Sequence, residues 1–281
     1  MRRVLILVNP EKDGAREAAA SLCPWLSRNV EVQSLDLSDR PIETQPDLVV
    51  VLGGDGSILR AARMLAGREI PVVGINLGKL GYLAEFTAEE FCHRFEAITT
   101  GQVPISRRMM LSARHERPGG ASQEHLVLND VLVAGGLAHR MVGIAATVDG
   151  EAVTTYFGDG VLVATPTGTT AYCLAAGGPI LAPGLEAMAL VPVCPHSLTH
   201  RPIVLPATSE VVLEPCGLQK EAACVIDGQE QMRLAHGERV RIRRSKSVFL
   251  LVHNGDRPTF ATLREKLNWG VSVQYNRKGS D

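Results

Sequence analysis

One acidic residue stands in a glycine-rich turn that could hold phosphate. Residues 47–62, DLVVVLGGDGSILRAA, are an apolar run that ends in glycines and continues in a helical pattern. Gly53, Gly54 and Gly56 would offer backbone N–H groups at a helix N-terminus, where phosphate is attracted. A carboxylate beside phosphate is repelled unless a cation lies between them or unless it takes a proton from a nearby hydroxyl. The position of Asp55 in this turn therefore predicts that it acts as the general base of a phosphoryl transfer.

The same turn predicts the phosphate contacts. A second glycine loop, GINLGKLGYLAEF at 74–86, follows another apolar strand, and two such loops at one sheet edge indicate an elongated phosphate-bearing ligand. Neither standard fingerprint fits, because no G-K-[ST] is present and Leu59 replaces the last glycine of G-x-G-x-x-G. A tight turn with Asp55 as a local cap is the competing interpretation. We expect the phosphate contacts to be Gly53, Gly54, Gly56, Ser57 and Arg60.

A second group of polar residues lies further along the chain. Asn129 and Asp130 interrupt the apolar run LVLNDVLVAGG, where buried polar groups need partners. An Asn amide suits the hydrogen-bonding edge of adenine, and a carboxylate suits a ribose diol. In TPTGTTAYCLAAGG, a polar wall would be formed by Thr167, Thr169 and Thr170, with Tyr172 available for stacking. Internal hydrogen bonding and ordinary helix capping are the alternatives.

The elements that must position these residues fall into two regions. The first hundred residues alternate strand and helix patterns, which predicts a parallel, Rossmann-like α/β sheet. The strands are expected at 4–8, 48–52 and 71–75, and the helices at 11–22, 57–66 and 88–99. From about residue 105 short strands alternate with turn signals, which predicts an all-β sandwich or barrel. Asp149-Gly150 is the clearest hairpin turn.

We therefore expect an α/β domain over residues 1–100 and a β-sandwich domain over 101–255. The segment TPTGTTAYCLAAGGP from Thr165 predicts a helix within the second domain. Residues 256–281 contain the helical pattern PTFATLREKLNWG, which is expected to pack back on the first domain.

Composition narrows the functional class. The formal net charge is -1 and no long basic block is present, so nucleic acid and anionic membranes are not expected partners. No segment reaches membrane-spanning length, which predicts a soluble, cytoplasmic protein. The six cysteines lack C-x-x-C pairs and are expected to be buried thiols. His196 and His200 have metal-ligand spacing, but flanking prolines favour a loop.

Taken together, these motifs resemble the NAD kinase family. The pieces LGGDGSILRAAR, INLGKLGYLAEF, RRMML, LND, GDGVLVATPTGTTAYCLAAGGPILAP, VPVCPHSLTHRPIVLP, IDGQ and LREKLNWG occur in the family's order over nearly the whole chain. The resemblance implies an α/β domain followed by a β-sandwich domain. It also implies transfer of a phosphoryl group from ATP to the adenosine ribose 2′-hydroxyl of NAD, giving NADP. A divalent metal, with Mg²⁺ carried by the phosphates, and a homodimer or homotetramer are further implications.

The resemblance also assigns residues. Asp55 would be the base and Gly56 a neighbouring contact, whereas Asn129 and Asp130 would hold the adenosine end. Asp227 or Gln229 would approach NAD from the sandwich side, and Arg140 matches a basic contact position. The remaining NAD contacts would be Asp159, Thr167, Thr170, Ala171, Tyr172 and Ala175.

Two residues depart from the family pattern, and two other functions compete. Asp130 replaces the usual Glu, and Cys173 replaces a common Ser. The GGDG turn also occurs in lipid kinases, but a lipid kinase needs an apolar membrane-facing cleft and the sequence shows no basic amphipathic helix. A catalytically inactive dinucleotide sensor is the other alternative, which Asp55 disfavours because a pure binder gains nothing from a carboxylate beside phosphate.

Overall fold

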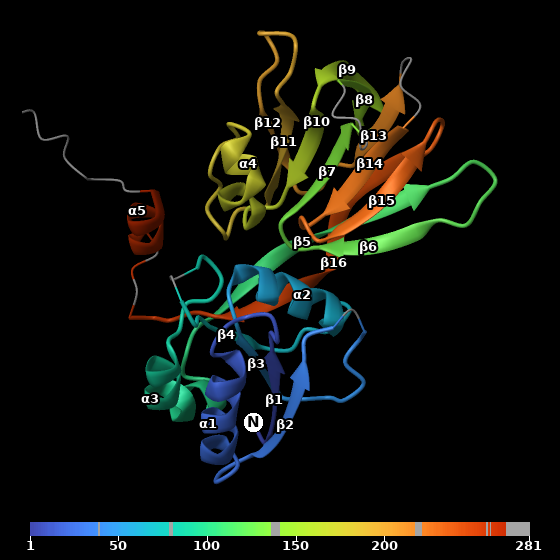
Figure 1. Ribbon diagram of the computed structural model, residues 1–281. Helices are drawn as coiled ribbons and strands as arrows, with labels where there is room; N and C mark the ends of the chain where they lie inside the picture. The colour runs from blue at the N-terminus through green and yellow to red at the C-terminus, as the bar shows by residue number, and fades with distance from the viewer. Residues whose placement is uncertain are drawn as a thin grey trace, which may run out of the picture.

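Two regions of different architecture share one long sheet. The computed structural model describes residues 1–38, 40–78, 81–135, 141–216, 221–256, 258 and 260–267. Figure 1 shows the α/β half in blue and teal below the β-rich half, with β5 and β16 crossing between them. The sequence-based expectation of an α/β region followed by an antiparallel β region is confirmed.

The α/β half is built on four parallel strands in the order β2-β1-β3-β4. The strands are β1 (Arg3–Val8), β2 (Glu31–Asp36), β3 (Leu48–Leu52) and β4 (Val72–Ile75). The helices are α1 (Ala15–Leu26), α2 (Asp55–Leu65) and α3 (Ala88–Thr99). Every residue of β3 is buried, with Val49 and Val51 in one apolar cluster and Leu48 and Val50 in another. A parallel strand covered on both faces produces the continuous apolar run seen in the sequence.

Strand β2 was missing from the sequence-based expectation. It pairs with β1 at the edge of the sheet, and five of its six residues are exposed. An edge strand of this kind has no buried face to impose apolar alternation, so the periodicity that marks the other strands is absent.

The β-rich half is a sandwich of two sheets. The first contains β5 (Ile105–Glu116), β6 (Gln123–Val127), β8 (Val142–Val148), β9 (Glu151–Gly158), β13 (Val211–Cys216) and β16 (Arg239–Val252). The second contains β7 (Asp130–Gly135), β10 (Gly160–Ala164), β11 (Ala187–Val193), β12 (Ile203–Pro206), β14 (Glu221–Ile226) and β15 (Glu230–Ala235). Side chains from both sheets, such as Val131 and Ile144, form a single apolar cluster between them.

Strand β16 ties the two halves together. It pairs with β13 and β5 in the sandwich. It also pairs in parallel with β4, where Leu251 lies opposite Val72. The first sandwich sheet and the α/β sheet are therefore continuous, with ten strands in all. Helix α3 ends at Thr99 and β5 begins at Ile105. The short connection and the shared sheet fix the face that each half presents to the other.

Three expected helices differ from the sequence pattern. The helix expected at 11–22 is α1, which begins only at Ala15, after Gly14 in a left-handed conformation with φ of 75°. The segment from Thr165 is broken into a 3₁₀ turn (Gly168–Thr170) and the one-turn helix α4 (Tyr172–Ala175), because Ala171 adopts a non-helical backbone with φ -101° and ψ -130°. At the C-terminus the structure describes α5 (Ala261–Leu267), and the rest of the expected helix lies outside the described residues. The Asp149-Gly150 hairpin is confirmed, with φ of 53° and 84° at its two residues.

Candidate active site

Asp55 begins α2 and is bound by the second glycine loop. Its Oδ2 atom accepts a hydrogen bond from the Tyr82 backbone N–H at 2.8 Å, and its Oδ1 atom accepts from Leu83 at 2.9 Å and Ala84 at 3.1 Å. A carboxylate offers about four acceptor positions, so one position on Oδ2 is left for another donor. The carboxylate thus joins the two glycine-rich segments at one sheet edge.

Gly81 makes this contact sterically possible. A Cβ atom on residue 81 would lie 1.9 Å from Asp55 Oδ1, far inside van der Waals contact. The loop can therefore close on the carboxylate only if residue 81 lacks a side chain. The sequence marked this glycine as part of a phosphate loop, but its role in the structure is to let the backbone approach Asp55.

A cavity of about 320 Å³ lies beside the first turn. We call it the glycine-turn cavity, and it is lined by Asn9, Glu11, Lys12, Leu37, Gly54, Gly56, Ser57, Arg60 and Gln229. Four of the five expected phosphate contacts therefore line one hollow. The fifth, Gly53, is buried behind it, where a Cβ atom would meet Ser57 Oγ at 2.2 Å.

Five residues that line this cavity were not expected phosphate contacts: Asn9, Glu11, Lys12, Leu37 and Gln229. Asn9 donates from Nδ2 to Ser57 Oγ at 2.9 Å, and Lys12 follows on the same loop after β1. The signal available in the sequence was their position just after an apolar strand, at the edge where ligands of parallel sheets bind. Gln229 arrives from the sandwich and donates from Nε2 to the Gly56 carbonyl oxygen at 2.8 Å.

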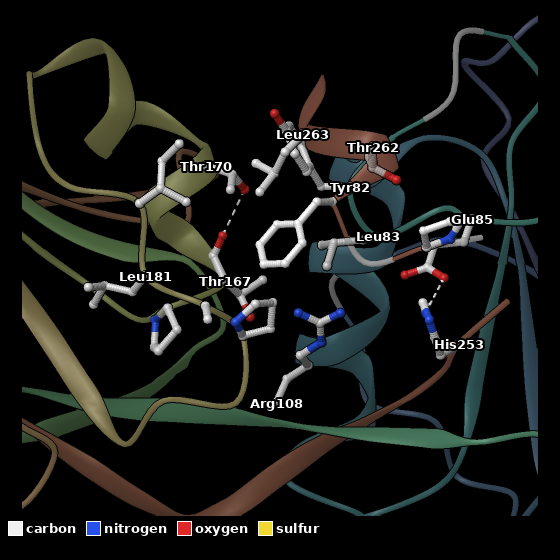
Figure 2. Close-up of a pocket in the computed structure, with 16 residues that line it drawn as sticks. Tyr82, Leu83, Glu85, Arg108, Thr167, Thr170, Leu181, His253, Thr262 and Leu263 are labelled. Atoms are coloured by element: carbon white, nitrogen blue, oxygen red, sulfur yellow. Dashed lines mark hydrogen bonds and ion pairs between the residues drawn. The ribbon is translucent and has the colours of Figure 1, made fainter. Parts of the chain in front are cut away.

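A second cavity, of about 280 Å³, lies where the two halves meet. We call it the Tyr82 cavity. Figure 2 shows Thr167 and Thr170 on one side of it, with Tyr82 and Leu83 opposite and Arg108 below. The remaining wall is formed largely by apolar residues of 180–183 and by residues before and within α5. Asp55 accepts hydrogen bonds from backbone N–H groups in the wall of the Tyr82 cavity. The residues before and after it in the chain, Gly54 and Gly56, line the glycine-turn cavity.

Arg108 gives the Tyr82 cavity a buried positive charge. Its side chain is 7% exposed, and burial lowers the pKa of the guanidinium although Glu85 acts in the opposite direction. Glu85 is itself occupied, because it accepts from His253 Nδ1 at 2.7 Å and from the Asn254 N–H at 2.9 Å. Within the described residues, Arg108 Nε and Tyr82 Oη have no hydrogen-bond partner. Neither side chain was among the expected site residues.

Asn129 and Asp130 lie together at the start of β7, and both are at least nine-tenths buried. The Asn129 Oδ1 atom has no partner among the described residues. Burial, reinforced by the nearby Asp227, raises the pKa of Asp130 to about 7. The expected pair is therefore a buried polar site and not a surface turn.

The threonine segment packs directly on this pair. Gly168 lies so close that a Cβ atom would be 2.0 Å from the Asn129 carbonyl oxygen, and the Thr165 N–H donates to the same oxygen at 2.8 Å. Thr167 is buried, and its carbonyl accepts from Thr170 Oγ1 at 3.0 Å. Tyr172 is 48% exposed on α4, which also carries Ala175, and Ala171 precedes that helix.

The other expected NAD contacts are scattered. Asp159 is exposed before β10 and accepts a hydrogen bond from the Cys194 thiol, which raises the pKa of that thiol. Asp227 is buried, and its carboxylate faces the backbone of residues 128–130. Gln229 lies in the glycine-turn cavity. Arg140 falls outside the described residues.

The cysteines and histidines do not form a metal centre in the described part of the chain. All six cysteines are free thiols, of which Cys173 and Cys224 are buried and Cys194 is exposed. Cys173 belongs to an apolar cluster with Leu181 and Val191, so it packs in a core. Among the residues described, no group of three or more His, Cys, Asp or Glu side chains could hold a metal ion. None of the described helices is long and apolar enough to cross a bilayer.

The two cavities and the turn between them are those of a ligand-binding protein. Three features suit a protein that binds a phosphate-bearing ligand: a glycine-rich strand-to-helix turn, a cavity beside it, and a cleft of threonines and apolar side chains at the junction with a β-sandwich. Two family models cover most of the chain: "ATP-NAD kinase N-terminal domain" matches residues 33–103 and "ATP-NAD kinase C-terminal domain" matches residues 128–254. The chain belongs to the NAD kinase family, and the resemblance noted in the sequence is confirmed.

Individual relatives agree over nearly the full length. The NAD kinase of Geobacter metallireducens is 38% identical over 281 residues, covering 96% of this chain and 99% of the relative. The NAD kinase of Heliobacterium modesticaldum is 39% identical over 284 residues, covering 96% of this chain and 100% of the relative.

Solved structures support the same fold. Yeast NADH kinase complexed with NADH superposes with a TM-score of 0.90 at 25% identity, covering 99% of this chain and 90% of that one. An NAD kinase from Archaeoglobus fulgidus in complex with ATP gives a TM-score of 0.77 at 27% identity, covering 95% and 99%.

Proposed function

We propose that this chain transfers the γ-phosphoryl group of ATP to the 2′-hydroxyl of the adenosine ribose of NAD, with Asp55 as the general base. The 2′-oxygen attacks the γ-phosphorus, the bond from that phosphorus to the ADP oxygen breaks, and the hydroxyl proton passes to Asp55. As a member of its family the chain is an enzyme that phosphorylates NAD to NADP.

One relationship carries the assignment of Asp55. Its carboxylate binds the loop that walls the Tyr82 cavity, and its two sequence neighbours line the glycine-turn cavity. A base at the junction of an acceptor site and a donor site can reach a hydroxyl from one while a phosphate chain occupies the other. The fourth acceptor position of the carboxylate is available for that hydroxyl.

The donor would occupy the glycine-turn cavity. Gly54, Gly56 and Ser57 supply the α2 N-terminus, and Lys12 and Arg60 supply positive charge. A divalent cation such as Mg²⁺ would be held mainly by the ATP phosphates. What the cation would supply is charge neutralisation on the transferred group.

The acceptor would lie along the threonine segment. Asn129 would form hydrogen bonds with adenine through its unpartnered Oδ1 and its side-chain NH₂ group. Asp130 would accept hydrogen bonds from the ribose diol. Further proposed NAD contacts are Gly56, Arg140, Asp159, Thr167, Thr170, Ala171, Tyr172 and Ala175. Asp227 and Gln229 would act indirectly, through the backbone of Asn129 and Asp130 and through Gly56. We also propose that the protein acts in the cytoplasm as a homodimer or homotetramer.

A coupled assay tests donor and acceptor together. NAD and NADH are offered with ATP, other nucleoside triphosphates or inorganic polyphosphate, and product is measured with an NADP-specific dehydrogenase. We expect NADP from NAD and ATP in the presence of Mg²⁺. Tight NAD binding without product under every donor and metal condition would instead make the chain a dinucleotide sensor.

A further inference from the structure

Asp227 is a buried acid whose side chain is directed at backbone. It is 5% exposed at the β14–β15 turn. Its Oδ2 atom accepts from the Leu128 N–H at 3.0 Å, and its Oδ1 atom accepts from Asn129 at 2.7 Å and Asp130 at 3.1 Å. In return, the Asp227 N–H donates to the Asp130 carbonyl oxygen at 2.9 Å. Four hydrogen bonds therefore lock the backbone that carries Asn129 and Asp130.

These contacts fill three of the acceptor positions of the Asp227 carboxylate, and the residue is only 5% exposed, so a ligand has little access to it. Three consecutive N–H groups share its two oxygens, and each such bond to a charged group is stronger than a neutral one. A turn with positive φ (51°) at Asp227 brings the carboxylate back over the start of β7. The residue thus acts on the NAD site from behind, through the two residues it holds.

Asp227 also places a second charge beside Asp130. Burial raises the pKa of both carboxyl groups, but the three N–H donors and the charge of Arg63 oppose that effect at Asp227 and not at Asp130. Asp227 is therefore the more acidic member of the pair, and Asp130 is the member that takes up a proton first as the pH falls. Among the described residues, the Cys173 thiol on α4 also senses Asp130: burial, reinforced by the Asp130 charge, raises its pKa to about 11.

We infer that Asp227 is a positioning residue of the NAD site, which holds Asn129 and Asp130 in place and keeps a negative charge against the Asp130 carboxylate. This inference rests on the proposed function, because it takes Asp130 as the acceptor for the ribose diol. The ionised form of Asp130 accepts the two hydroxyl hydrogen bonds as charge-assisted bonds, which are stronger than those that the protonated acid accepts. NAD affinity should therefore rise as the pH passes through about 7.

The test is NAD binding by calorimetry from pH 5.5 to 8.5 with the full chain and with Asp227→Asn. At pH 8.5, where Asp130 is ionised in both proteins, we expect the variant to bind NAD about tenfold more weakly, because the amide cannot accept all three bonds. Removing the neighbouring charge should also move the midpoint of the pH profile down by about one pH unit. A residue that only supported the fold would weaken binding without moving the midpoint.

Asp149→Asn is the matched control. Asp149 occupies another Asp-Gly hairpin turn with φ of 53°, and its Oδ1 atom accepts from the Glu210 N–H at 2.7 Å. This control removes the same charge from the same kind of turn in the other sheet of the sandwich, so affinity and midpoint should match the unsubstituted chain. Unchanged affinity or an unmoved midpoint in Asp227→Asn would overturn the inference.

A second measurement applies even if Asp227→Asn does not fold. The unsubstituted chain should show the midpoint near pH 7, and Asp130→Asn should abolish it. A flat profile in the unsubstituted chain, or the same midpoint in Asp130→Asn, would overturn the inference. NADP formation by the unsubstituted chain, measured separately, shows whether the proposed function itself has failed.

Discussion

Gln229 donates a hydrogen bond from Nε2 to the carbonyl oxygen of Gly56 over 2.8 Å, although 173 positions separate them in the chain. The contact joins the sandwich to the glycine turn that opens α2. Arg63 of the same helix forms an ion pair with Glu230, with 3.0 Å between Nε and Oε1. The turn after β14 therefore reaches both the Asn129–Asp130 backbone, through Asp227, and the glycine-turn cavity, through Gln229.

Replacing Gln229 should affect the donor more than the acceptor. In Gln229→Ala the Gly56 carbonyl loses its partner, and a hydrogen bond of this kind contributes about 0.5–1.5 kcal/mol. We expect the KM for ATP to rise roughly 2–10-fold, with the Kd for NAD nearly unchanged. Gln231→Ala, an exposed glutamine on β15, is the control and should behave as the unsubstituted chain. A larger effect on NAD than on ATP would contradict the assignment.

The two functions of Asp55 can be separated by substitution. In Asp55→Asn the side chain still accepts from the second loop through its oxygen but cannot take a proton. We expect kcat for NADP formation to fall by about 10²–10⁴, with a modest change in thermal unfolding from the lost Tyr82 hydrogen bond. Asp55→Ala should lose the loop contacts as well and unfold at a lower temperature. Near-normal turnover in Asp55→Asn would remove this residue from the chemistry.

Lys12 should act on phosphate alone. It lines the glycine-turn cavity and lies near the second glycine loop, with Nζ 3.7 Å from the Cβ position of Gly78. We expect Lys12→Ala to raise the KM for ATP about tenfold, as for loss of one charge-assisted contact. The effect should shrink at high salt because an exposed charge is screened. Lys246→Ala removes an exposed lysine of β16 and is the control.

Gly168 should tolerate no side chain. An added Cβ would lie 2.0 Å from the Asn129 carbonyl oxygen, and a backbone atom cannot move aside as a flexible side chain can. We expect Gly168→Ala to lower the free energy of unfolding by about 1–3 kcal/mol and to weaken NAD binding by displacing Asn129. Gly184→Ala is the control, since no atom lies within 4 Å of its Cβ position. Denaturant unfolding and calorimetry would report the two effects separately.

Asp130 should make stability depend on pH. Its pKa is raised from 3.8 to about 7 by burial and by Asp227, so between these values the folded chain binds more protons than the unfolded chain. The contribution of Asp130 to the free energy of unfolding is fully present below pH 4 and is lost as the pH rises through 7. Asp130→Asn has no such loss. On going from pH 5 to pH 8.5, we expect its free energy of unfolding to rise by roughly 2–4 kcal/mol relative to that of the unsubstituted chain. Urea unfolding at the two pH values measures the difference, and equal pH dependence in both proteins would contradict it.

The sequence by itself determined the local elements and the chemistry that they could carry. Apolar runs such as Leu48–Leu52 and the glycines after them predict strand, turn and helix because each pattern depends only on neighbours in the chain. The polar pair Asn129–Asp130 was recognisable because an apolar strand cannot bury such groups without partners. The polar edge strand β2 escaped this reasoning because it has no buried face.

Only the tertiary structure decided which distant residues meet. The sequence singled out Asp55 and the second glycine loop separately, but the folded chain brings the Tyr82 N–H within 2.8 Å of the carboxylate. Asp227 looked like a ligand contact beside a hairpin, whereas in the structure it holds the backbone of Asn129. Arg108 lies in the middle of a strand pattern, and nothing local in the sequence marks it as part of a cavity. The physical reason is that periodicity reports which face of an element is buried, whereas hydrogen-bond partners and cavities depend on how separate elements pack.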